Sequence, residues 1–155
     1  MDTIGPIHNR ISRFFIDVDD GNWESVEALM TERVHLDYSS FGAGDPIDLT
    51  PKEVTGAWKE LLPGFDATHH QIGNLLVDSK EQKASAKVHA TVTHFIDGAE
   101  GGELWVVYGS YNIALIHEGG AWMISSIQFN FKFQAGNQDL PVLAQTRAEA
   151  NDKSG

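Results

Sequence analysis

The sequence predicts an α+β fold in which a group of helices precedes an antiparallel sheet. Apolar side chains recur mostly at helical spacing over residues 4–62, whereas residues 67–133 contain four long stretches typical of strands. The 155 residues, 41% of them hydrophobic, are enough for one domain with a sizeable core. Because long strands twist strongly, we expect the sheet to curl around the helices that cover it and to leave a cavity at its mouth.

The first elements are two helices and a strand. Residues 4–19 place an apolar side chain on one face at each turn, which predicts an amphipathic helix. Asp20-Gly21-Asn22 ends it, and Asn22 is a capping residue for a second, short helix. Residues 34–38 alternate between apolar and polar side chains, which predicts a strand.

A loop and a third helix follow. Residues 41–49 are rich in turn residues and predict the loop. Thr50-Pro51-Lys52-Glu53 has the pattern of a capping box with proline at the first helical position, so it begins the third helix. Pro63-Gly64 ends this helix.

The remaining chain predicts a meander of strands and a tail. The expected strands are residues 67–77, 84–96, 103–116 and 121–133. They are joined by a charged turn and two glycine-rich turns, at 78–83, 97–102 and 118–120. We expect one domain over residues 1–140, followed by a tail over 141–155 that is partly disordered and begins with a short helix.

Composition excludes several classes of function. The absence of cysteine excludes disulfide frameworks, thiolate metal sites and cysteine nucleophiles. The formal net charge of −11 argues against nucleic acid and anionic membrane surfaces as partners, since both require clustered lysine and arginine. No apolar run reaches the length of a membrane helix and no secretory signal is visible, so we expect a cytoplasmic protein.

Polar side chains occupy three positions at which apolar ones are expected. Asp19 lies four residues after Phe15 on the apolar ridge of the first helix, where a carboxylate needs a partner. The alternative is a solvated carboxylate at the helix end. His70 and His94 each share a strand face with apolar residues, and imidazole is the side chain best suited to acid/base chemistry near neutral pH. The alternative for each is a hydrogen-bonded histidine of the core.

Tyr108, Ser110 and Asn112 share one face of the third expected long strand. Three neutral hydrogen-bonding groups in a row can orient a histidine, hold a carbonyl or fix a water molecule. They are equally consistent with the solvated face of a sheet whose other face carries Trp105 and aliphatic residues. Tyr38, at the end of the first strand, is either an interior phenol or an ordinary packing residue.

The sequence offers no recognisable metal or nucleotide site. His69 and His70 are adjacent in a strand, so their rings point to opposite faces, and His69 is expected to be exposed. No glycine-rich dinucleotide or phosphate loop and no nucleophile elbow is present. We therefore expect a protein that uses neither a metal ion nor another cofactor.

Four segments together resemble a known family. They are WESVEALMTERVHLDYSSF (23–41), THHQIG (68–73), HATVTH (89–94) and GSYN (109–112). In order and spacing they resemble scytalone dehydratase and its relatives in the SnoaL-like, NTF2-like superfamily, over about residues 5–140. The resemblance implies a cone-shaped barrel, with a curved antiparallel sheet closed by three N-terminal helices.

The resemblance also implies a catalytic constellation. Asp19 matches the family carboxylate that pairs with a histidine, and His94 matches that histidine. His70 matches the principal acid/base, and Ser110 matches the hydroxyl that orients it.

Further matches concern the substrate. Asn112 matches an amide that binds the substrate, and Tyr38 matches one of two tyrosines that hold a water molecule against the substrate carbonyl. The second tyrosine is missing, because Val18 stands at its position. Tyr108 lies on the same strand face as Ser110 and is the candidate replacement, with packing of the barrel wall as its alternative role.

The implied activity is that of a cofactor-independent dehydratase, a hydro-lyase that eliminates water β to a carbonyl. Because no inward lysine or arginine is expected, its substrate would be a neutral cyclic or polycyclic hydroxy compound, whether steroid, terpenoid or polyketide. The alternatives are a SnoaL-like isomerase or polyketide cyclase and a non-catalytic binding protein, because one fold supports many functions. The resemblance further implies a homodimer or homotrimer.

Overall fold

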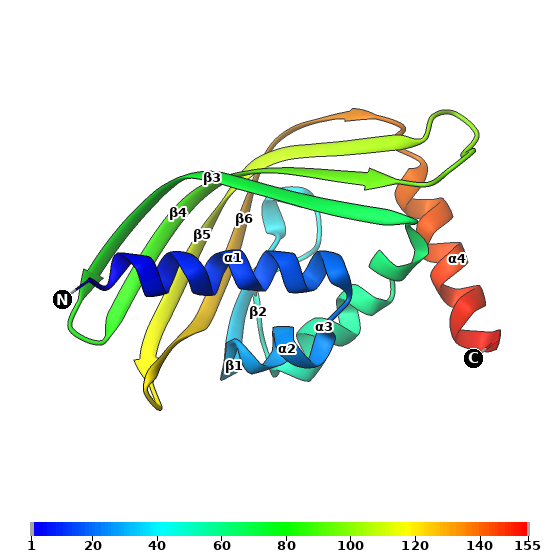
Figure 1. Cartoon of the computed structure of the whole chain (residues 1–155). Coiled ribbons are helices and arrows are strands. Elements are labelled where there is room, and N and C mark those ends of the chain that lie inside the picture. The colour runs from blue at the N-terminus through cyan, green and yellow to red at the C-terminus, as the bar shows by residue number, and fades with distance from the viewer. Residues whose placement is uncertain (1, 155) are drawn as a thin grey trace.

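Over residues 2–154, which a computed structural model describes, the chain has an α+β fold (Figure 1). Its elements are α1 (Ile4–Asp20), α2 (Trp23–Ala28), β1 (Met30–Asp37), η1 (Ser39–Phe41), β2 (Ile47–Leu49), α3 (Pro51–Lys59), η2 (Leu62–Gly64), β3 (Ala67–Lys80), β4 (Lys83–Phe95), β5 (Leu104–Glu118), β6 (Ala121–Gly136) and α4 (Leu140–Ser154). In this part of the chain no helix combines the length and the apolar character needed to cross a membrane.

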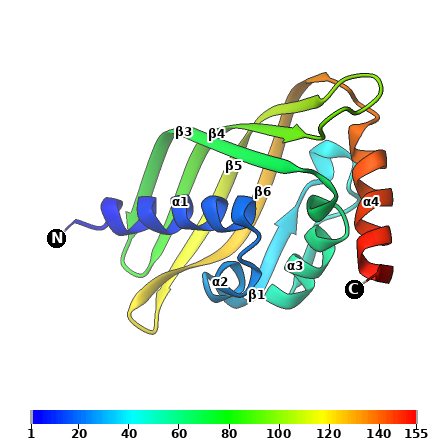
Figure 2. The same ribbon diagram turned by 45° about the vertical axis from the view of Figure 1, so that its right-hand side comes forward.

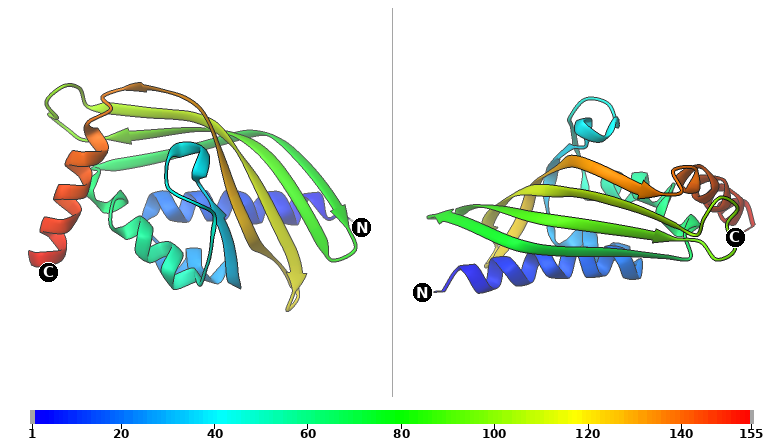
Figure 3. Two further views of the ribbon diagram at one scale, coloured as in Figure 1. Left: turned by 180° about the vertical axis from the view of Figure 1, so that it is seen from behind. Right: turned by 90° about the horizontal axis from the view of Figure 1, so that it is seen from above.

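The strands form one curved sheet, in the order β2-β1-β6-β5-β4-β3. β2 and β3 are its two edges, so the sheet is not closed into the expected barrel. The long strands β3 to β6 arch over α1, which crosses beneath them (Figures 1 and 3). The sheet is also mixed rather than antiparallel throughout, because β1 pairs with β6 in parallel. No hairpin joins β1 to the later strands, so the sequence did not predict whether β1 runs parallel or antiparallel to its neighbour β6.

The three predicted helices form, but Asn22 precedes α2 without a capping hydrogen bond from its side chain, and α3 ends at Lys59, before the expected stop at Pro63-Gly64. α1 buries the apolar side chains of one face, including Ile7, Ile11 and Phe14, and ends at Gly21 in the left-handed conformation. The capping box of α3 is present: Thr50 Oγ1 accepts the N–H of Glu53 at 3.2 Å, and Glu53 Oε1 accepts the N–H of Thr50 at 3.1 Å.

The curvature of the sheet coincides with two irregularities in β6. The pairing of β5 with β6 shifts between Tyr108 and Gly109 and again between Ala114 and Leu115, which leaves Lys132 and Ser125 as extra residues of β6. Such β-bulges bend a strand and increase its twist. The concave side that results faces α1 (Figure 3).

The segment expected to be a partly disordered tail is the helix α4. Its inner face buries Leu140, Ala144 and Ala148. Ala144 packs directly on Gly64 of η2, where a Cβ atom would overlap the carbonyl oxygen of Ala144. Arg147 Nη2 also contacts Asp66 Oδ1 at 2.7 Å. The helix is therefore docked against η2 (Figure 2).

Candidate active site

The concave side of the sheet encloses a cavity of about 430 Å³, a volume typical of small-molecule sites. Its wall is mostly aromatic and aliphatic, and among the described residues that line it none is lysine or arginine. The polar side chains in the wall are those of Tyr38, Asp45, His70, His94, Trp105 and Tyr111.

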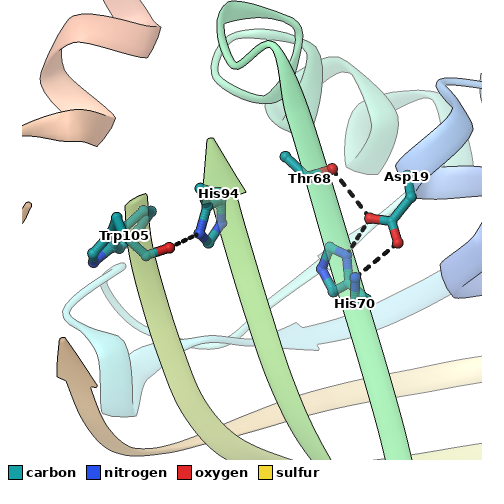
Figure 4. Close-up of polar contacts among 5 residues, drawn as sticks. All are labelled: Asp19, Thr68, His70, His94 and Trp105. Atoms are coloured by element: carbon teal, nitrogen blue, oxygen red, sulfur yellow. Dashed lines mark hydrogen bonds and ion pairs between the residues drawn. The ribbon is translucent and has the colours of Figure 1, made fainter. Parts of the chain in front are cut away.

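His70 is held by Asp19 from behind the cavity wall (Figure 4). The Nδ1 atom of His70 lies 2.6 Å from Oδ1 of Asp19, and the backbone N–H of His70 donates to Oδ2 at 2.7 Å. Thr68 Oγ1 donates to Oδ1 at 3.1 Å. The side chains of His70 and Asp19 are only 10% and 15% exposed. With Nδ1 bound to the carboxylate, Nε2 is the ring nitrogen left for a ligand.

The pairing follows from the place of α1 against the edge strand β3. Asp19 lies in the last turn of α1, beside the start of β3, so His70 is the histidine within reach. Burial would raise the pKa of Asp19, but the hydrogen bonds and charge of His70, together with Thr68, hold that pKa below its usual value. Asp19 therefore stays ionised and is placed as expected, on the inner side of the helix.

The expected pairing of Asp19 with His94 is wrong. His94 lies one strand further from α1, on β4, and its Nδ1 is 3.0 Å from the carbonyl oxygen of Trp105 (Figure 4). Its ring is 5% exposed and stacks on Trp105 with a centroid distance of 4.2 Å. Burial lowers the pKa of His94 to about 4, so the imidazole is neutral near neutral pH.

Tyr38 and Tyr111 form a second polar group in the cavity wall. Their rings lie 6.3 Å apart in an edge-to-face arrangement, and each phenol affects the pKa of the other. Burial raises the pKa of Tyr38 to about 12 and that of Tyr111 well above its usual value. Both phenols therefore keep their protons near neutral pH. Tyr38 is thus an interior phenol, which was one of the two roles that the sequence allowed.

The predicted inward positions of Tyr108, Ser110 and Asn112 are wrong. Ser110 Oγ accepts from Asn130 at 3.2 Å, Asn112 donates to Gln128 at 3.1 Å, and Tyr108 stacks on Phe133 at 4.3 Å. These contacts lie on the convex face of the sheet, which is the solvated-face alternative. Ser110 therefore does not orient His70, and neither Asn112 nor Tyr108 reaches the cavity.

Tyr111 is the cavity residue that sequence reasoning missed. It alternates with Ser110 and Asn112, so it lies on the opposite, concave face with Trp105 and Ile113. The signal was available, because a phenol within an otherwise apolar strand face is a candidate interior donor. Val18 lines the same cavity without a hydroxyl, and Tyr111 supplies the second phenol beside Tyr38.

Within residues 2–154, no group of three or more histidine, aspartate or glutamate side chains is arranged to hold a metal ion. The arrangement consists instead of a carboxylate-bound imidazole, a neutral imidazole and a phenol pair around an apolar space. Such groups can take up, return and stabilise protons and developing negative charge.

Comparisons with known proteins agree with this architecture. A family model for a SnoaL-like domain matches residues 2–128. No curated protein matches the chain in sequence. The solved structure of the Kfla4162 protein from Kribbella flavida is 19% identical with a TM-score of 0.80, over 94% of this chain and 95% of that one.

Two further solved structures carry names that suggest chemistry. A candidate scytalone dehydratase from Novosphingobium aromaticivorans is 16% identical with a TM-score of 0.71, over 87% of each chain. The hexachlorocyclohexane dehydrochlorinase LinA-type3 from Novosphingobium barchaimii is 12% identical with a TM-score of 0.72, over 86% of this chain and 89% of that one. At these identities the likeness is one of fold.

Proposed function

Because this chain belongs to the SnoaL-like domain family, we propose that it is a hydro-lyase that eliminates water β to the carbonyl of a neutral cyclic substrate. The observation that carries the proposal is the His70–Asp19 pair in the wall of an apolar cavity that also contains a phenol pair. Elimination from a carbonyl compound needs a base, an acid and a donor for the enolate oxygen, and these side chains supply all three without a cofactor.

His70 is the base. Asp19 accepts the proton of Nδ1, which leaves the lone pair of Nε2 available to remove the proton α to the carbonyl. The same carboxylate stabilises the imidazolium that results. General base catalysis of this kind contributes about 10²- to 10⁴-fold to the rate.

The Tyr38–Tyr111 pair holds the carbonyl. Both hydroxyls keep their protons and both side chains line the cavity, so a phenol O–H is available to donate to the substrate oxygen. As the α C–H bond breaks, its electrons form the enolate double bond and the negative charge moves to this oxygen. A donor positioned at that oxygen lowers the barrier because the charge is largest in the transition state.

The second half of the reaction returns the proton. The enolate collapses to the carbonyl, the new carbon–carbon double bond forms, and the bond to the β-hydroxyl breaks. The departing hydroxide takes the proton from Nε2 of His70 and leaves as water, so base and acid are one residue. This requires both groups to leave from the same face of the substrate.

The enclosure favours uncharged substrates. No cationic side chain among the described lining residues offers a partner for a carboxylate or phosphate, and the ionised Asp19 lies just behind the wall. An anionic substrate would lose its hydration without compensation. Loss of chloride, the reaction in the name of the LinA-type3 dehydrochlorinase, would use the same base.

The test is an assay of cyclic β-hydroxy ketones in D₂O. We expect 3-hydroxycyclohexanone or a bicyclic β-hydroxydecalone to give the ultraviolet absorbance of an enone, and His70→Gln to lower the rate by at least ~10²-fold. His69→Gln is the matched control, because His69 is the exposed neighbour on the same strand and should keep full activity.

Three outcomes separate the alternatives. Enone formation that depends on His70 supports the hydro-lyase. Deuterium entering the α position by nuclear magnetic resonance, with an isomerised ketone and no loss of water, would instead favour the isomerase. Binding without exchange or elimination in any member of the panel would leave a binding protein and overturn the proposal.

A further inference from the structure

His94 is a buried polar group for which the reaction above has no use. It is 5% exposed, lines the cavity, and is packed between Phe65 and Trp105 at ring distances of 4.8 and 4.2 Å. Its Nδ1 is bound to the carbonyl oxygen of Trp105, and Nε2 has no hydrogen-bond partner among residues 2–154. One of its nitrogens is therefore left for whatever fills the cavity.

The contact with Trp105 fixes which nitrogen carries the proton. A carbonyl oxygen can only accept, so Nδ1 of His94 must be the donor. Because this imidazole is neutral, Nε2 then has a lone pair and no proton. The indole of Trp105 is itself held, since its Nε1 donates to Gln134 Oε1 at 2.8 Å. The His94 imidazole is thus held at Nδ1 by the Trp105 carbonyl, and the Trp105 ring on which it stacks is held by Gln134.

An acceptor of this kind favours a specific partner. A buried acceptor that stays unpaired when a ligand displaces water loses a hydrogen bond, and a ligand that brings a donor restores it. We propose that His94 is a specificity residue that accepts a hydrogen bond from a substrate hydroxyl that the reaction retains. The inference rests on the proposed function and names the substrate class as cyclic ketones with a second, non-departing hydroxyl.

The hydroxyl at His94 differs from the one that leaves. A departing hydroxide must receive a proton, and Nε2 of His94 has none to give. The substrate carbonyl is also excluded as the partner of His94, because its oxygen and Nε2 are both hydrogen-bond acceptors. Only a group with its own hydrogen, a hydroxyl or N–H, satisfies this position, and an ether or a halide does not.

The test uses bicyclic ketones that cannot eliminate water. The probes are 1-indanones with a hydroxyl at ring position 4, 5, 6 or 7, the four matching methyl ethers, and unsubstituted 1-indanone. Their dissociation constants are measured by calorimetry or tryptophan quenching. We expect at least one hydroxyl isomer to bind about 10-fold or more tightly than both its ether and the parent ketone, because sites built around a hydrogen bond discriminate strongly.

Two variants connect the preference to His94. His94→Phe keeps a ring between Phe65 and Trp105 and removes both nitrogens, so the preference should fall to about 1. His94→Gln offers an N–H to the Trp105 carbonyl and an oxygen to the ligand, so part of the preference should return. Equal binding of hydroxyl and ether forms by the wild type, or an unchanged preference in His94→Phe, would overturn the proposal.

A measurement on the wild-type protein keeps the test decisive if the variants do not fold. With ¹⁵N-labelled histidine, the Nε2 resonance of His94 should shift when the preferred hydroxyl probe is added and should stay in place with its ether. No shift with any hydroxyl isomer would refute the role. Neither measurement depends on turnover. A failed enone assay with an intact hydroxyl preference would therefore overturn the proposed elimination reaction but not the role of His94 in binding.

Discussion

Both oxygens of the Asp19 carboxylate bind a single residue, His70. Oδ1 contacts the ring Nδ1 at 2.6 Å and Oδ2 accepts the backbone N–H at 2.7 Å. The carboxylate therefore fixes the strand and the ring together, and the ring cannot rotate about its side-chain bonds without breaking the first contact. Such a support holds a base in one orientation before the substrate arrives.

We predict that Asp19 and His70 act as one unit. Asp19→Asn should lower turnover by about 10-fold or more, because an amide neither fixes the tautomer nor stabilises the imidazolium. Adding it to His70→Gln should have little further effect, as expected for residues that work together. Steady-state kinetics of the single and double variants measure this coupling.

The complementary pair is Asp19 and His94. Since they do not contact each other, Asp19→Asn should lower turnover by about the same factor in the His94→Phe background as in the wild type. A strong coupling between Asp19 and His94, with none between Asp19 and His70, would contradict the observed geometry.

We predict that Tyr111, rather than Tyr108, supports the carbonyl. Tyr111→Phe removes the hydroxyl paired with Tyr38 and should lower kcat by about 10-fold or more. Tyr108→Phe is the control of equal chemistry on the convex face and should keep wild-type kcat. A loss confined to Tyr108→Phe would mean that the convex face takes part in the reaction.

Protonation of His94 should make the fold sensitive to mild acid. Its pKa is about 4 in the folded protein against an ordinary 6.5, so the unfolded chain takes up this proton first as the pH falls. The contribution of His94 to the free energy of unfolding is therefore fully present above pH 6.5. It is lost as the pH falls towards 4, and amounts to about 3 kcal/mol. Urea unfolding at several pH values measures this slope.

His94→Phe is the matched control for the pH dependence. It should flatten the decrease between pH 6.5 and 4, while the contribution of Asp19, whose pKa lies below 3.8, is lost only at lower pH. Parallel curves for the variant and the wild type in the upper window would show that His94 is not the group responsible.

A final prediction concerns the docking of α4. Gly64→Ala places a methyl group against the backbone of Ala144, so the helix has to move and the protein should lose about 1–3 kcal/mol of stability. Trypsin should then cleave after Arg147 more readily. Gly73→Ala is the control, because nothing lies within 4 Å of its added Cβ. Equal stability of the two variants would argue against the tight contact.

Local signals in the sequence were sufficient for most elements. The apolar ridge of α1, the capping box at Thr50 and the long alternating strands each depend on neighbours in the chain, and all form as expected. The direction of β1 and the docking of α4 depend on contacts between distant segments, such as Ala144 with Gly64. Periodicity carries no information about such contacts.

The difference between local signals and contacts of distant segments also explains which features of the site the sequence predicted. Alternation placed Tyr108 and Tyr111 on opposite faces of β5, but both faces carry aromatic and polar residues, so the pattern did not say which face is concave. The choice between His70 and His94 as the partner of Asp19 depends on which strand lies next to α1, which is a matter of sheet order. It was therefore easier to predict which residues are candidates for the site than to predict which residues they contact.

The bulge at Lys132 connects the length of β6 to the chemistry of the cavity. Beyond it, the strand resumes with Phe133 opposite Tyr108 on the convex side and Gln134 opposite Val107 on the concave side. Loss of the bulge with Lys132 drawn into the ladder would shift this register by one residue, pair Phe133 with Val107, and put a phenyl ring where the Trp105 indole now finds its acceptor. Deleting Lys132 itself, by contrast, keeps Phe133 opposite Tyr108 and Gln134 opposite Val107, so we expect ligand recognition to survive a one-codon deletion at this position.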